Sequence, residues 1–178
     1  MRRPITRSLI VAALASAIVA PAFAADPCAG FKWDVSKEHA LFSGPATTLT
    51  AGRDAGSAPA IDTDRLYELK LTPQDQTAFA LAPGKKMLTD GAFAGLATFK
   101  VNTSGAYRVS VDVPFWIDVV AGGKLVATKD FQGQHACDAP HKIVEFELTA
   151  AQPLVLQLSG STKSVVRLTV TQSSVPNP

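Results

Sequence analysis

The sequence predicts an all-β fold, a jelly-roll or Greek-key β-sandwich of about eight or nine antiparallel strands, with a possible short N-terminal helix. Three observations predict it. Apolar and polar residues alternate with a period of two in several short segments, turn residues recur about every 8 to 12 positions, and no helical pattern of about 10 to 15 residues separates the segments. The last observation disfavours a parallel α/β sheet. A closed barrel is the alternative architecture.

Residues 1–24 have the order of a secretory signal peptide. Arg2, Arg3 and Arg7 precede the apolar stretch 9–20, and small residues end at Ala24. The apolar stretch is too short to span a bilayer as a helix, so we expect no transmembrane segment after cleavage. The sequence therefore predicts a periplasmic or secreted protein.

The charge of the remaining chain excludes a nucleic-acid-binding function. Removing the three signal-peptide arginines from the 17 basic residues leaves 14, against 15 acidic residues, so the net charge is −1. Charges of both signs are scattered, and no basic face for nucleic acid is indicated. We expect a monomer.

Two cysteines follow the signal peptide, Cys28 and Cys137. An even count in an oxidising compartment predicts one disulfide between them. In the chain-entropy model, a bridge that closes so long a loop stabilises the fold by about 4 to 5 kcal/mol.

Residues 25–65 form an N-terminal extension. Asp34 or Ser36 could N-cap a short helix that ends before Gly44, with Glu38 in its first turn. An irregular segment that packs Trp33 onto the sandwich is the alternative. Residues 47–51 form either a short edge strand or part of a poorly ordered loop.

Residues 66–172 form the sandwich domain. Its centre is the apolar stretch 106–120, in which a half-buried strand is followed by a strand that is apolar enough to be buried on both faces. The pattern places strands at 66–71, 78–81, 97–101, 107–112, 115–120, 125–128, 144–148, 154–158 and 166–170. Turn residues at 102–105 and 121–124 predict two hairpins, one joining 97–101 to 107–112 and one joining 115–120 to 125–128.

The predicted loop 131–142 concentrates side chains that can ligate metal. His135, Asp138 and His141 lie within seven residues. Two imidazoles and a carboxylate can together hold zinc or iron. Their spacing matches no standard metal motif. The alternative is a solvated loop with two surface histidines, held by the disulfide at Cys137.

Trp116 and Asp118 are candidates for a ligand-binding surface. Asp118 lies within an apolar strand, where a carboxylate is either functional or paired, for instance with Arg108 on a neighbouring strand. Exposed aromatic side chains could form a sugar-binding platform on a sandwich face, although aromatics in this pattern also suit a core. The candidates are Trp33, Trp116, Phe115 and Tyr107.

The segments WIDVV and HACDAPHKIVEFEL, with the strands around them, resemble small exported bacterial proteins labelled homogentisate 1,2-dioxygenase. The same succession of strands and turns is similar to that of the bacterial pre-peptidase C-terminal domain, a jelly-roll-like β-sandwich. The first resemblance implies Fe(II) and oxygen-dependent ring cleavage, with His135, His141 and one of Asp138 or Glu145 as ligands. The chain departs from authentic dioxygenases in its length, its export and its lack of a cupin-type histidine cluster.

The residues favour a non-catalytic, exported binding or envelope-associated module without a cofactor. Its ligand would be a protein, a small molecule or a carbohydrate. The alternative is an iron-dependent enzyme like homogentisate 1,2-dioxygenase. No nucleophile elbow, phosphate-binding loop or dinucleotide fingerprint points to another activity.

Overall fold

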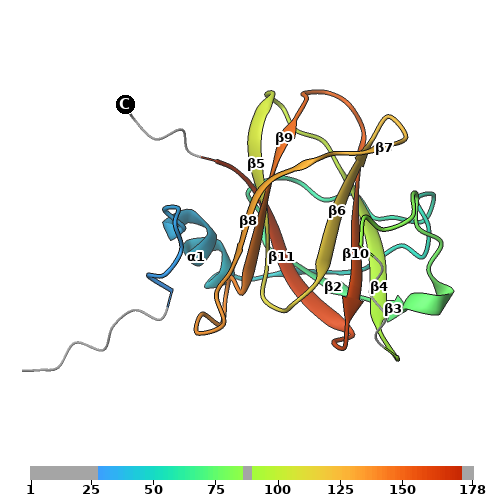
Figure 1. Ribbon diagram of the computed structural model, residues 1–178, viewed down its shortest axis with the longest axis horizontal. Helices are drawn as coiled ribbons and strands as arrows, with labels where there is room; N and C mark the ends of the chain where they lie inside the picture. Colours follow the sequence, from blue (N-terminus) through green and yellow to red (C-terminus); the bar gives the residue numbers. More distant parts are fainter. Residues whose placement is uncertain (1–27, 86–89, 174–178) are drawn as a thin grey trace, which may run out of the picture.

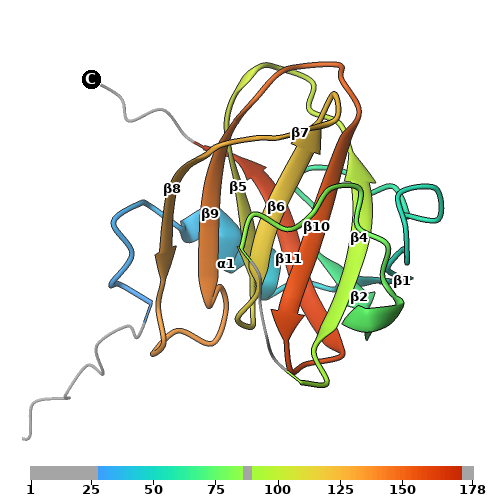
Figure 2. The ribbon, with the colours of Figure 1, turned by 45° about the vertical axis from the view of Figure 1, so that its right-hand side comes forward.

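Two β-sheets pack face to face, and one short helix covers the outer side of the larger sheet (Figures 1 and 2). The computed structural model describes residues 28–85 and 90–173. The predicted signal peptide lies outside these residues. The described part of the chain confirms the predicted all-β sandwich, with eleven strands where eight or nine were expected.

The larger sheet has six strands and the smaller has five. The larger contains, in spatial order, β1 (Thr47–Thr50), β2 (Tyr67–Lys70), β11 (Val165–Gln172), β5 (Gly105–Val111), β9 (Lys142–Leu148) and β8 (Thr128–Gly133). The smaller contains β3 (Thr72–Pro73), β4 (Phe93–Phe99), β10 (Leu154–Ser161), β6 (Trp116–Ala121) and β7 (Lys124–Leu125). All pairs are antiparallel except β1 with β2, which are parallel.

The core lies between the sheets, where every second side chain points inward. The residues that the alternating pattern predicts to point inward form this core. Val109 and Val111 of β5 belong to one buried cluster with Leu156 and Leu158 of β10. Burying aliphatic side chains of this size stabilises the fold by about 1.5 to 3 kcal/mol each.

Helix α1 (Ser36–Phe42) packs on β11 and forms a third layer (Figure 1). The predicted helix therefore exists, but its N-cap position is Val35, which has no side-chain capping bond. Asp34 instead accepts hydrogen bonds from the N–H and Oγ of Ser36, at 2.9 and 2.6 Å. These bonds lower the pKa of the Asp34 carboxyl.

The N-terminal segment is fastened to β8 and to the loop that follows it. Cys28 and Cys137 form the expected disulfide, which joins positions 109 residues apart. Lys32 Nζ lies 2.6 Å from Asp130 Oδ1, and Gln132 Nε2 donates to the Gly30 carbonyl at 2.7 Å. The described part of the predicted extension, residues 28–65, is thus packed on the sandwich, and its strand β1 joins the larger sheet.

Three details of the predicted strand pattern were wrong. Strands β4 and β5 do not form a hairpin, because the chain crosses at residues 100–104 from the smaller sheet to the larger one. Residues 128–133, half of which were assigned to a loop, form strand β8 instead. The hairpin of β6 with β7 is confirmed.

The third error concerns residues 78–81, which are not a strand. The N–H and carbonyl of Leu81 bond to the side-chain amide of Gln157, at 3.1 and 3.2 Å, instead of a strand backbone. Gln157 is 1% exposed and occupies the outer face of β10, since Leu156 and Leu158 point inward. This segment therefore crosses the outside of the smaller sheet.

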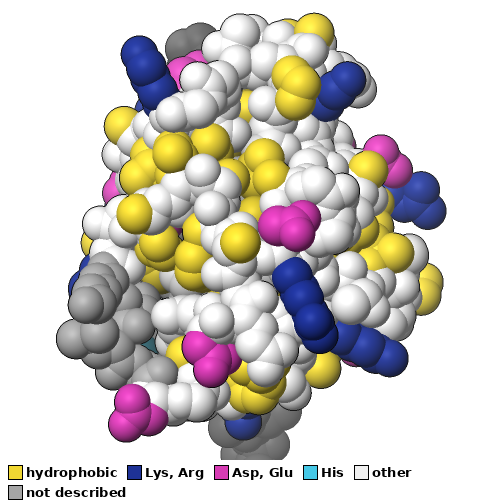
Figure 3. All heavy atoms as spheres, turned by 90° about the vertical axis from the view of Figure 1, so that its right-hand side faces the viewer, with side chains coloured by type: hydrophobic (Ala, Val, Ile, Leu, Met, Phe, Trp, Pro, Cys, Tyr) yellow, Lys and Arg dark blue, Asp and Glu magenta, His cyan; other side chains and the backbone are white. Residues whose placement is uncertain are grey.

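Figure 3 views the side of the molecule where β3 and β4 lie. Hydrophobic side chains gather there between scattered charged ones. Within the described ranges, the large hydrophobic residues that are exposed are Leu125, Phe131 and Val165. None of the helices formed by the described residues is long and apolar enough to cross a membrane.

Candidate functional site

Trp116 and Asp118 form the centre of a surface that draws residues from three separate parts of the chain. We call it the Trp116 patch and define it as Trp116, Asp118, Lys85 and Lys142. Both predicted ligand-surface residues are on β6. Ile117 and Val119, which alternate with them along the strand, belong to the core, so Trp116 and Asp118 point to the outer side of the smaller sheet.

Asp118 holds the indole of Trp116 in place. Trp116 Nε1–H donates to Asp118 Oδ1 at 3.0 Å, and the Gly84 N–H donates to Oδ2 at 3.0 Å. Asp118 is 8% exposed, and each of its carboxylate oxygens accepts one of these hydrogen bonds. The alternative partner, Arg108, is on the other sheet and bonds to different residues, so that predicted pairing was wrong.

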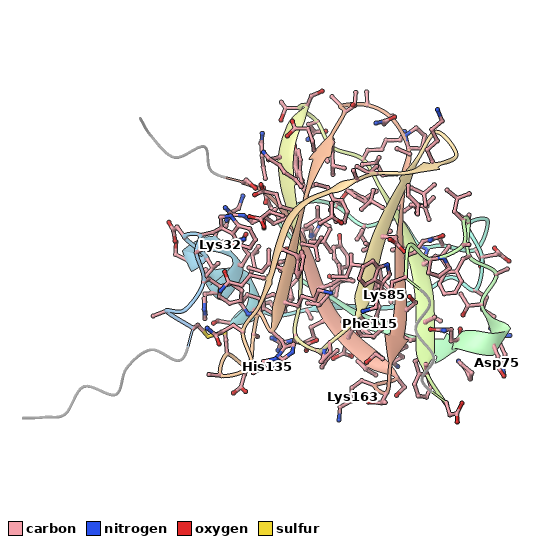
Figure 4. All side chains as sticks on the ribbon, in the orientation of Figure 1. Lys32, Asp75, Lys85, Phe115, His135 and Lys163 are labelled. Atoms are coloured by element: carbon pink, nitrogen blue, oxygen red, sulfur yellow. A yellow bond between two sulfur atoms is a disulfide. The ribbon has the colours of Figure 1, made fainter. Side chains whose placement is uncertain are left out.

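Two lysine ammonium groups flank the Trp116 ring. Lys85 Nζ lies 5.7 Å and Lys142 Nζ 5.5 Å from the ring centroid, within cation–π range. Lys142 comes from the other sheet, where it is the first residue of β9. Its side chain is on the same face of the strand as the core residues Val144 and Phe146. Its Nζ crosses to donate to the Phe115 carbonyl at 2.7 Å. Figure 4 labels Phe115 and Lys85 in this lower half of the molecule.

The two ammonium groups have no acidic partner among the residues that the structure describes. No carboxylate oxygen of residues 28–85 or 90–173 lies within 4.0 Å of either Nζ. Burial lowers the pKa of the half-buried Lys142; the charge of Lys85 adds to this, and Asp118 opposes it. The site therefore holds two neighbouring cations, one of them partly desolvated, with one nearby carboxylate that is already committed to Trp116 and Gly84.

His135 and His141 lie in the loop between β8 and β9 that leads into Lys142, and Figure 4 labels His135 there. Their ring centroids are 5.2 Å apart in an edge-to-face arrangement. Burial lowers the pKa of His141, the neighbouring His135 and Lys142 lower it further, and Asp112 opposes them. Sequence reasoning identified both histidines but missed Lys85 and Lys142. One signal in the sequence could have identified Lys142: the alternation of its strand places this charged residue on the same face as Val144 and Phe146.

The predicted metal ligands are only partly brought together. The two imidazoles are neighbours, but Asp138 and Glu145 do not converge with them; Asp138 is exposed, and Glu145 bonds to Arg108. Throughout residues 28–85 and 90–173, one group of three potential ligands converges, and it consists of Cys28, His39 and Cys137. Its two cysteines form the disulfide.

A buried charge network lies between α1 and the larger sheet, and sequence reasoning did not find it. Arg108 Nε donates to Glu145 Oε2 at 3.3 Å, and its Nη1 lies 3.8 Å from Glu38 Oε1. Thr171 Oγ1 donates to Glu38 at 2.6 Å and Ser173 Oγ to Glu145 at 2.7 Å. These bonds satisfy groups that the helix removes from water, so this network fastens the helix to the sheet.

No family model matches the sequence, and no curated protein matches it. Among solved structures, the chain is similar to the pre-peptidase C-terminal domain of a collagenase from Bacillus anthracis. The identity is 10%, the TM-score is 0.37, and the match covers 71% of this chain and 97% of that one. The resemblance to homogentisate dioxygenase gains no support from families or curated proteins.

Proposed function

We propose that this chain is an exported, non-catalytic binding module, and that the Trp116 patch binds an anionic saccharide through a carboxylate of the sugar. The N-terminal pattern and the disulfide support export. One observation carries the binding proposal: a partly exposed indole, fixed by Asp118, lies within cation–π range of two ammonium groups that have no carboxylate partner among the described residues.

The charge of the patch favours an anion. Bringing Lys142 partly out of water costs free energy, and an anionic ligand between the two ammonium groups would offset that cost. Hydrogen bonds between a lysine and a carboxylate are charge-assisted and are worth about 1.5 to 3 kcal/mol. A neutral ligand can accept hydrogen bonds from the ammonium groups but lacks the attraction between opposite charges.

The indole favours a ligand with an apolar face. Trp116 is oriented by its own hydrogen bond, so little side-chain entropy is lost when a ring packs against it. A uronic acid offers both groups, a ring face for the indole and a carboxylate for the lysines. An anionic membrane surface fits less well, since Trp116 is only partly exposed.

The test uses the intrinsic fluorescence of Trp116. The chain has two tryptophans, so Trp33→Phe leaves Trp116 as the reporter. We expect saturable quenching or enhancement on titration with oligogalacturonate, and none with a neutral malto-oligosaccharide of equal length. In this background Lys142→Met weakens binding by about 10-fold or more. Lys70→Met, a lysine on the distant strand β2, leaves it unchanged.

Three outcomes would contradict the proposal. They are no saturation with the uronate, equal responses to the acidic and neutral sugars, and equal losses in Lys142→Met and Lys70→Met. Vesicles of phosphatidylglycerol are the comparison ligand, and binding to these vesicles without binding to the saccharide would assign the patch to an envelope lipid instead.

A further inference from the structure

Three potential metal ligands converge beneath α1, away from the Trp116 patch. Cys28 Sγ, Cys137 Sγ and His39 Nε2 all lie within 4.8 Å of one another, and His39 Nε2 is 4.0 Å from Cys137 Sγ. The three residues come from the start of the described chain, from helix α1 and from the β8–β9 loop. The fold therefore assembles a two-sulfur, one-nitrogen set from distant positions.

The surroundings suit a metal centre. Phe31, Val35 and Ile143 belong to the same buried cluster as the two cysteines, and Trp33 packs against it. Apolar walls limit water access and strengthen metal–ligand bonds. A cavity of about 420 Å³ reaches Cys28 and His39, so a small reductant and a metal ion have a route to the site.

We propose that reduction of the Cys28–Cys137 pair turns this cluster into a binding site for one thiophilic divalent cation, Zn²⁺. Zinc bonds of about 2.0 to 2.3 Å to nitrogen and sulfur place tetrahedral ligands about 3.5 to 3.8 Å apart. The separations of His39 Nε2 from the two sulfurs, at most 4.8 Å, shorten to that range with movements of about 1 Å, while the sulfurs, which are bonded to each other in the oxidised chain, move apart. His39 supplies the third ligand, and the cavity leaves the fourth position open to water.

The chemistry balances with a phosphine as the reductant. The phosphine attacks one sulfur, the S–S bond breaks, and water supplies the oxygen of the phosphine oxide and the two protons of the thiols. Binding of Zn²⁺ then releases both thiol protons, because the thiolate is the ligand form. In the oxidised protein neither sulfur has a thiolate to offer, so the disulfide keeps the site closed.

The experiment compares the oxidised chain with the chain reduced by tris(2-carboxyethyl)phosphine and freed of it without oxygen. Zn²⁺ is titrated by calorimetry, and Cd²⁺ is added separately to detect thiolate-to-metal charge-transfer absorption. We expect one Zn²⁺ per reduced chain, no binding at this site in the oxidised chain, and a thermal midpoint that Zn²⁺ raises only in the reduced form.

Two variants separate the site from adventitious binding. His39→Gln removes the third ligand, and we expect it to weaken Zn²⁺ binding at least about 10-fold. His135→Gln is the matched control, a histidine of the imidazole pair, and leaves binding unchanged. The proposal is overturned if the reduced chain binds no Zn²⁺, if the oxidised chain binds equally well, or if both variants behave alike. Loss of the β-sheet circular dichroism on reduction would also overturn it, since no preassembled site would then exist.

Discussion

Arg108 is the residue whose replacement tests most sharply how the N-terminal helix is held. In Arg108→Met, the two carboxylates it contacts remain buried without their main cation. The Glu38 side chain is 3% exposed and keeps a hydrogen bond from the Thr171 hydroxyl, at 2.6 Å. Glu145 keeps the Ser173 hydroxyl and the exposed Lys129, whose Nζ is 3.7 Å away.

The expected loss of unfolding free energy is about 3 to 5 kcal/mol, the usual consequence of removing one partner from a buried ion pair. With a urea m-value of about 2 kcal/mol/M, the midpoint falls by about 1.5 to 2.5 M. Equilibrium urea unfolding followed by circular dichroism measures it. The control is Arg65→Met, which removes an exposed pair with Asp62 and changes stability by less than about 1 kcal/mol.

A rescue variant separates lost charge from lost packing. Adding Glu38→Gln and Glu145→Gln to Arg108→Met removes the orphaned charges, and we expect stability to return to within about 1 kcal/mol of the original. If Arg108→Met costs no more than the exposed control, the network does not hold the helix. If the triple variant is no better than the single one, packing of the arginine side chain accounts for the loss.

Three further predictions follow from single contacts. Burial lowers the pKa of His141 below its ordinary value of 6.5, so at acidic pH the unfolded chain binds more protons than the folded chain. The unfolding free energy therefore falls as the pH drops from about 6.5. His141→Gln makes this fall smaller, which urea midpoints measured at several pH values would show. Gly52→Ala places a Cβ 2.5 Å from the backbone of the facing loop and lowers the unfolding free energy by about 1 to 3 kcal/mol, whereas Gly56→Ala, with its nearest contact at 3.4 Å, changes it by less than about 0.5 kcal/mol. Replacing both Cys28 and Cys137 by serine lowers it by about 2 to 5 kcal/mol, and a loss below 1 kcal/mol in calorimetry would refute a stabilising role for the bridge.

Strand positions and their inward faces could be predicted because alternation is a local property. Val109 and Leu168 face the core as their patterns indicate. Strand partners could not be predicted in the same way, because alternation indicates which face of β4 or β5 points into the core but not which of the two sheets the strand joins. The turn residues between them suit a crossing between sheets as well as a hairpin.

The errors around the site have a common cause, which is contact between residues far apart in the chain. Leu81 is paired by the side chain of Gln157, 76 residues later, and no local pattern reveals such a partner. Arg108 points away from the core and was considered only as a partner of Asp118, because alternation does not show that a helix covers that face. Trp116 was found by residue type, while its contact with Lys142, which comes from the other sheet, required the fold.

The chemical shift of the Trp116 indole N–H tests the proposed binding surface most directly. A nitrogen–proton correlation spectrum of the chain contains one indole signal for each of its two tryptophans, and Trp33→Phe assigns them. The account predicts that oligogalacturonate shifts the Trp116 signal, whose N–H is bonded to Asp118, and leaves that of Trp33 in place. An unmoved Trp116 signal at saturating saccharide, or equal shifts of both signals, would contradict it.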